Sequence, residues 1–169
     1  MKSATFALIA GLAYLVLGVL GLVPATLVPP PSDAPATSFA LLYGYLFGLW
    51  PVNVLHSALH IAIGFWGLCA WRQKCSAVAY ARVLALLFAT LALLGTLPEA
   101  NTLFGAMPIH GHDVWLHALT ALAAFYFGWR ARATARERRR SAAERRQRSV
   151  SVARERRFGL SDRREHLAA

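Results

Sequence analysis

Four long apolar runs, separated by more polar stretches, restrict what this chain can fold into more than any other feature. They cover about residues 5–23, 52–71, 77–97 and 114–129, and the first three have roughly the 20 residues that an α-helix needs to cross ~30 Å of hydrocarbon. The fourth is at the short end of that range. Segments in lipid must satisfy their own backbone hydrogen bonds, so these runs predict helices. We expect an all-α fold, an integral membrane four-helix bundle.

Charge divides the chain into two parts near residue 130. From Arg130 onward lie fourteen of the eighteen Lys and Arg residues and five of the eight acidic residues. The part before is so apolar that the whole chain is 57% hydrophobic and only 15% charged, whereas soluble globular chains are about 25% charged. We predict a four-transmembrane-helix domain at 1–130 and an Arg-rich cytoplasmic tail at 131–169.

The basic residues also predict an orientation, because cytoplasmic loops of membrane proteins are enriched in Lys and Arg. Outside the tail, these residues precede the first run or flank the link between the second and third: Lys2, Arg72, Lys74 and Arg82. The other two loops, residues 24–51 and 98–113, contain neither Lys nor Arg. Both termini should therefore be cytoplasmic, and these two loops should face outward.

The N-terminal third allows alternative interpretations. The first run, preceded by Lys2, could be a signal peptide, but its length favours a retained helix. The loop after it begins with a Pro-rich part, about 24–35, that we expect to be extended. Its second part, residues 39–50, is apolar and aromatic but too short to span a membrane. We expect that part to lie along the outer interface or to cap the bundle.

Histidines gather at the predicted outer face. Asn53, His56 and His60 follow the 3–4 spacing of one helix face in the second run. Asp113 and His117 are four residues apart at the start of the fourth run, again on one face. Because both helix ends are outward, these five residues should meet if the second and fourth helices are neighbours. His110 and His112 lie next to them in the outer loop.

Such a cluster predicts a metal site as one of three interpretations. Ionisable groups inside a membrane span normally face the bundle interior or a wet cavity, and imidazole is the commonest metal ligand. The candidate ligands are His56, His60, Asp113 and His117, which could hold Zn, Cu or Fe. Two histidines could instead ligate a haem iron.

The other interpretations need no metal. The cluster could be a structural or pH-sensitive network of polar groups hydrogen-bonded across helices, or it could serve a small ligand or a proton. Asn53 and Asp113 could simply cap their helices or place an acid in the first turn. The sequence HSALH also lacks the glutamate of a zinc-protease helix. We expect no cofactor as the simplest answer, with a transition metal or haem as the alternative.

The chain resembles the domain-of-unknown-function 4383 family of bacterial membrane proteins. The similar features are PVNVLHSALHIAIGFWGL, LALLGTLP and MPIHGHDVWLHAL, all within residues 48–129. The resemblance implies a multi-pass four-helix protein of the bacterial inner membrane with no assigned activity. Its matching positions are Asn53, His56, His60, Asp113 and His117. The Pro-rich part of the first loop and the Arg-rich tail are expected to lie outside the family pattern.

The tail is rich in Ala, Arg and Glu, which favour a helix, and it has no apolar stripe. Its candidate contact residues are all arginines: Arg136, Arg138, Arg139, Arg140, Arg145, Arg146 and Arg148. We favour contact with anionic membrane lipids, then docking on a partner subunit of a membrane complex. Binding to nucleic acid is disfavoured, because only Phe158 supplies an aromatic side chain.

These features favour a small non-catalytic membrane protein, an accessory or structural subunit whose tail engages lipid or a partner. A metal- or haem-binding membrane protein is the rival hypothesis. The sequence has no nucleophile elbow, phosphate loop or acid pair, so we predict no enzyme. Cys69 and Cys75 are expected to be free thiols, because their end of the second run is predicted to be cytoplasmic.

Overall fold

The computed structural model describes residues 3–73, 76–130, 138–150 and 153. The chain divides into two units, residues 1–131 and 132–169, which are treated separately. In the second unit, residues 138–150 form a helix. Cys75, expected to be a free thiol, and Arg136, a candidate contact residue of the tail, lie outside the described residues.

The first unit is mostly helical. Its helices are α1 (Ser3–Leu20), α2 (Val54–Trp71), α3 (Ala77–Gly95) and α4 (His112–Phe125), with a 3₁₀ turn η1 (Pro24–Thr26) and a π-helical turn η2 (Tyr126–Arg130) that continues α4. Three described helices, α1, α2 and α3, are long and apolar enough to cross a membrane. Large apolar side chains such as Ile9, Leu86 and Leu119 are exposed on the outer faces of the helices, where a bilayer would cover them. The prediction of apolar, membrane-type helices is confirmed to this extent.

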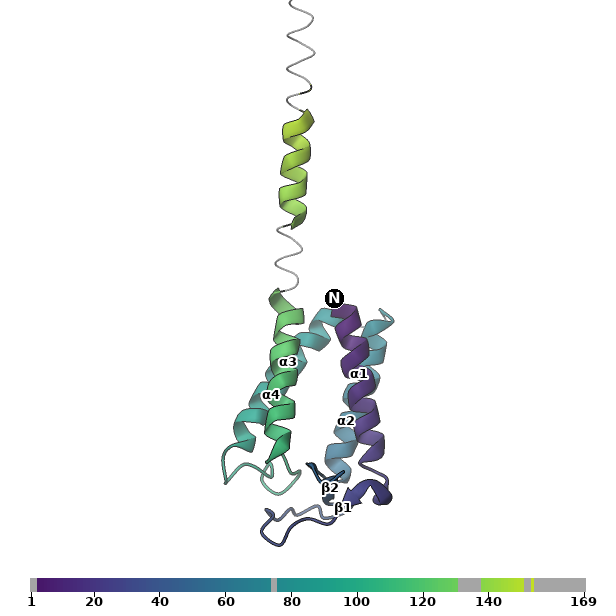
Figure 1. Cartoon of the computed structure of the whole chain (residues 1–169), viewed down its shortest axis with the longest axis vertical. Helices are drawn as coiled ribbons and strands as arrows, with labels where there is room; N and C mark the ends of the chain where they lie inside the picture. Colours follow the sequence, from purple (N-terminus) through teal and green to yellow (C-terminus); the bar gives the residue numbers. More distant parts are fainter. Residues whose placement is uncertain (1–2, 74–75, 131–137, 151–152, 154–169) are drawn as a thin grey trace, which may run out of the picture. The chain divides into compact units, whose positions relative to one another are not determined.

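The helices associate as two pairs. α1 packs along most of α2, and α3 packs along most of α4 (Figure 1). Aromatic rings join the pairs: Tyr14 of α1 stacks on Phe88 of α3 with 4.8 Å between ring centroids, and Phe6 stacks on Phe127 at 5.2 Å. The N-terminal end of α1 and the end of α4 lie at the same end of this unit (Figure 1).

Most helix ends differ from the predicted ones by two to four residues, for local reasons. α1 stops at Leu20, three residues before Val23, and the chain then meets Pro24. α2 begins at Val54 because Asn53 is extended and caps the helix with its side chain. α3 ends at Gly95, since the residue before Pro98 is disfavoured in a helix.

The expectation of a purely α-helical fold was wrong in one segment. A three-stranded antiparallel sheet, in the order β1 (Leu27–Val28), β2 (Gly44–Leu46) and β3 (Trp50–Val52), lies at the opposite end of the unit from the start of α1 (Figure 1). The segment 39–50, expected to be interfacial, turns back on itself at Phe47 and Gly48, both with positive φ. Glycine in a short loop between two apolar strands favours such a hairpin, and Leu46 and Val52 are buried beneath it.

Glycines let the backbones of α1 and α2 touch, as small residues do in membrane helix pairs. A Cβ added at Gly67 would lie 2.6 Å from Gly11 Cα, and one at Gly64 would lie 2.6 Å from the backbone nitrogen of Leu15. Neither neighbour is the end of a flexible side chain. A methyl group at either position must therefore push the helices apart.

We predict that Gly67→Ala lowers the free energy of unfolding by about 1–3 kcal/mol, the usual effect of overpacking. At a helix position with free space, the same substitution raises the free energy of unfolding by about 1 kcal/mol. A decrease is therefore enough to indicate close packing at Gly67. The measurement is thermal or denaturant unfolding in detergent. Ala62→Val, at an exposed position of α2, should change stability by less than about 0.5 kcal/mol. A Gly67→Ala protein as stable as the wild type would contradict the close packing.

Candidate metal centre

The predicted histidine cluster lies where the first turns of α2 and α4 meet. His56 and His60 come from α2, and Asp113 and His117 come from α4. All four side chains are at most 3% exposed. Although α2 packs mainly on α1 and α4 mainly on α3, these polar side chains reach one another across the two pairs.

The side chains converge on a small volume. His56 Nε2 lies 3.2 Å from His60 Nε2 and 3.6 Å from Asp113 Oδ2. One ring nitrogen from each of His56, His60 and His117 lies within 4.8 Å of the other two. Nitrogen ligands sit about 2.0–2.1 Å from a tetrahedral zinc ion, which places them roughly 3.3–3.4 Å apart. The first two distances are already close to that value, and the His117 nitrogen lies within 4.8 Å of the other two.

Several donors and acceptors of the cluster have no hydrogen-bond partner among the described residues. They are both ring nitrogens of His117 and both carboxylate oxygens of Asp113. Buried polar atoms are nearly always hydrogen-bonded, and leaving one unpaired costs about 1–3 kcal/mol. This set contains only nitrogen and oxygen atoms that bind cations, so a metal ion would satisfy several of them together.

Aromatic side chains form one wall of the cluster. Phe88 stacks on the His117 ring with 5.0 Å between centroids, and Tyr14 meets the His60 ring edge-on at 4.9 Å. Tyr14 is itself hydrogen-bonded to Thr120 at 2.7 Å. These residues were not predicted, since neither the apolar run of α1 nor that of α3 indicates which residue faces the histidines.

The packing favours a single ion over a haem. Axial haem ligands lie on opposite faces of a porphyrin, but His56 and His60 are one turn apart on one helix with 4.4 Å between ring centroids. The His56 and His117 rings are 6.0 Å apart, and Phe88 covers His117. Side chains thus occupy the space that a porphyrin would need.

Asn53 positions the cluster rather than joining it. Its Oδ1 accepts a hydrogen bond from the backbone N–H of His56 at 2.9 Å, which caps α2. Its Nδ2 donates to the carbonyl oxygens of Phe39 at 3.0 Å and Ala106 at 2.8 Å. The side chain is completely buried. One amide group therefore attaches the start of α2 to both outer loops. Of these contacts, the sequence predicted only the helix cap.

The two remaining loop histidines lie outside the cluster. His110 is 9% exposed and packs near Tyr45 of β2, with 6.2 Å between ring centroids. Burial lowers the pKa of His110. His112 is the first residue of α4 and is exposed. Asp113 is therefore a first-turn acid, and Gly111 with φ 64° holds the cap position.

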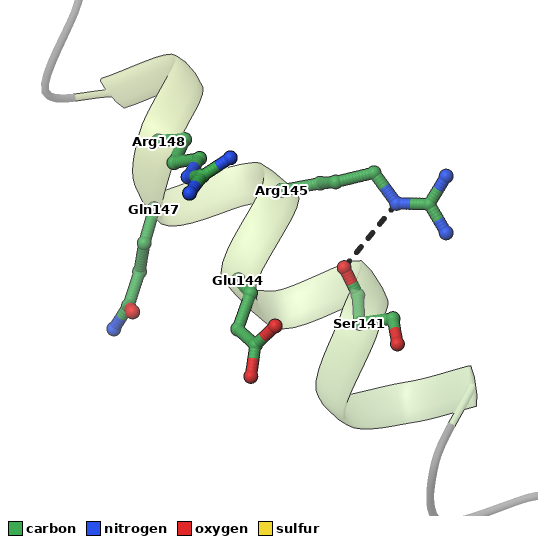
Figure 2. A pocket seen from close by; sticks show the side chains of 5 residues that line it. All are labelled: Ser141, Glu144, Arg145, Gln147 and Arg148. Atoms are coloured by element: carbon green, nitrogen blue, oxygen red, sulfur yellow. Dashed lines mark hydrogen bonds between the residues drawn. The ribbon is translucent and has the colours of Figure 1, made fainter.

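The basic tail can be described only in part. The helix at 138–150 presents exposed arginines: Arg138, Arg139, Arg140, Arg145, Arg146 and Arg148. Figure 2 shows that the side chains of Glu144, Arg145 and Gln147 project outward from this single helix, and Arg145 Nε donates to the backbone oxygen of Ser141 at 3.3 Å.

Cys69 at the end of α2 is a free, exposed thiol.

We predict that Asn53→Ala lowers the free energy of unfolding by about 2–4 kcal/mol, because a cap and two buried carbonyl partners are lost. Ser76→Ala is the matched control. Ser76 caps α3 through one exposed hydrogen bond to the N–H of Ala79, so its loss should cost about 0.5–1 kcal/mol. Chemical unfolding in detergent measures both. Equal effects of the two substitutions would refute the positioning role of Asn53.

Comparison with known proteins gives one match. The family model described as "Domain of unknown function (DUF4383)" matches residues 4–130. The match is wider than the region 48–129 expected from the motifs, and the Pro-rich loop lies inside it, contrary to expectation. The tail lies beyond it. Searches of curated proteins and of solved structures found no match. Because the matched region covers most of the chain and contains both halves of the histidine cluster, this protein belongs to the DUF4383 family.

Proposed function

We propose that this protein is a multi-pass membrane protein that binds one divalent transition-metal ion between α2 and α4. The ligands are His56, His60, His117 and Asp113. The observation that carries the proposal is the convergence of three buried imidazoles and a buried carboxylate whose polar atoms largely lack partners among the described residues. A purely structural network would be expected to satisfy those atoms internally.

The donor set favours particular ions. Three imidazole nitrogens and one carboxylate oxygen suit Zn²⁺, Co²⁺ or Fe²⁺, whereas Cu⁺ prefers sulfur ligands. Four protein ligands complete a tetrahedral shell, the arrangement of sites that hold a metal rather than use it for catalysis. The proposal therefore retains the expectation that the protein is not an enzyme.

The membrane placement belongs to the same proposal. α4 and η2 together form a continuous helical segment from His112 to Arg130, long enough to serve as a fourth span. The distribution of basic residues supports a cytoplasmic location for both termini, in a bacterial inner membrane. The metal ion then lies near the outer face, at the level of the first turns of α2 and α4.

A second candidate function concerns the tail. The six exposed arginines on the helix at 138–150 support attachment to anionic lipid or to an acidic partner subunit, which would make the protein an accessory component of a membrane complex. This role is compatible with metal binding because it uses a separate part of the chain. Deleting residues 138–169 should reduce binding to anionic vesicles without changing metal content.

The metal site is tested by titrating the chelator-treated protein in detergent with Zn²⁺ and Co²⁺. The wild type should bind one equivalent and, with Co²⁺, develop the visible absorption of a tetrahedral site. His60→Ala should weaken metal binding at least ~10–100-fold. Loss of a residue that only hydrogen-bonds to a metal ligand already has an effect of that size. His112→Ala, which changes an exposed neighbouring histidine, should leave affinity unchanged. A wild type that binds neither ion, or equal affinities in all three proteins, would overturn the proposal.

A stability measurement separates a metal site from a structural network. His117 has no hydrogen-bond partner among the described residues, so His117→Leu should leave the metal-free protein as stable as the wild type, or more stable by about 1–3 kcal/mol. Zn²⁺ at 100 times its dissociation constant should stabilise the wild type by about 2.7 kcal/mol and the variant not at all. If His117→Leu instead unfolds the metal-free protein, His117 serves a polar network.

A further inference from the structure

An apolar groove runs between α3 and α4 on the surface of the first unit, with a volume of about 700 Å³. Its lining contains only apolar side chains: Ala85, Leu86, Ala89, Ala92, Ala118, Ala121, Leu122, Phe125 and Trp129. Five of these nine residues are alanines, whose small side chains leave space between the two helices. Pockets of this size commonly hold small ligands.

The length and direction of the groove match one leaflet of a bilayer. Along α4 and η2 it extends over twelve residues, from Ala118 to Trp129, and eleven steps of about 1.5 Å give about 16 Å. Half of a hydrocarbon core of ~30 Å is about 15 Å. The groove ends at Trp129, a residue type that prefers the membrane–water interface. The groove is therefore about as long as one acyl chain in a single leaflet.

A cation stands at the interfacial end of the groove. Arg82 of α3 donates from Nε to the carbonyl oxygen of Gly128 at 3.2 Å, and its guanidinium lies over the Trp129 ring, 5.1 Å from the centroid. These two contacts hold the group beside the groove. Among the residues that the structure describes, no carboxylate forms an ion pair with Arg82.

We propose that this groove binds one anionic phospholipid of the cytoplasmic leaflet. An acyl chain lies against the alanines of α3 and α4, and the phosphate contacts the terminal nitrogens of Arg82, whose planar fork suits phosphate oxygens. Charge complementarity and the leaflet-long groove select this ligand over a partner helix, which would span both leaflets. The inference is independent of the metal site, since the groove and the histidine cluster share no residue.

The test uses native mass spectrometry of the full chain in detergent, with phosphatidylglycerol and phosphatidylcholine as probes. One phosphatidylglycerol should remain bound per chain, at least ten times more tightly than phosphatidylcholine. Ala89→Phe fills the groove and Arg82→Gln removes the cation, and each should reduce phosphatidylglycerol retention at least tenfold. Arg82→Lys keeps the charge and should retain part of the binding.

Two matched controls exclude general effects. Ala62→Phe adds the same ring at an exposed position of α2, and Arg72→Gln removes a cation at the end of α2 that lies over Trp71 at 5.6 Å. Both should bind phosphatidylglycerol as the wild type does. Equal retention of the two lipids, or equal losses in control and groove variants, would overturn the proposal. So would a dimer in the wild type that Ala89→Phe converts to monomer, since a second copy would then occupy the groove.

Discussion

The buried amide of Asn53 is the interaction on which the outer end of this protein depends. It caps α2 through His56 and holds a carbonyl from each outer loop, at Phe39 and Ala106. Without it, the first turn of α2 would fray and His56 would lose its fixed position. A side chain that binds no ligand thus controls the geometry of those that can, as residues behind metal ligands commonly do.

The buried cluster that Asn53 supports destabilises the folded protein unless a cation is bound there. Three imidazoles and a carboxylate are buried together, and several of their atoms lack partners among the described residues. Each unpaired atom opposes folding by about 1–3 kcal/mol. A cation reverses the sign of this contribution, because it converts mutually repelling lone pairs into ligands. Binding energy at the site would therefore appear directly as folding stability, as it does in other metal sites that form only in the folded chain.

The sequence predicted the helices and the convergence of His56, His60, Asp113 and His117 for a simple reason. Long apolar runs have few alternatives to helix, and alternating topology brings the starts of α2 and α4 to one end. The small sheet was missed because β1 and β2 are separated by fifteen residues, and two or three residues of pairing leave no periodic signal. The carbonyl partners of Asn53 and the position of Tyr14 beside His60 also depend on tertiary packing, which no local pattern encodes.

The glycine contacts between α1 and α2 have a mechanical consequence. Backbones that touch cannot slide past each other without collision, so these contacts restrict movement between α1 and α2. The α3–α4 pair follows in sequence after the link between Trp71 and Ala77, and the histidine cluster joins the two pairs near the starts of α2 and α4. An ion bound by α2 and α4 would connect one helix of each pair and so hold the two pairs together. Binding or release of the ion would therefore change how strongly the α1–α2 pair is held to the α3–α4 pair.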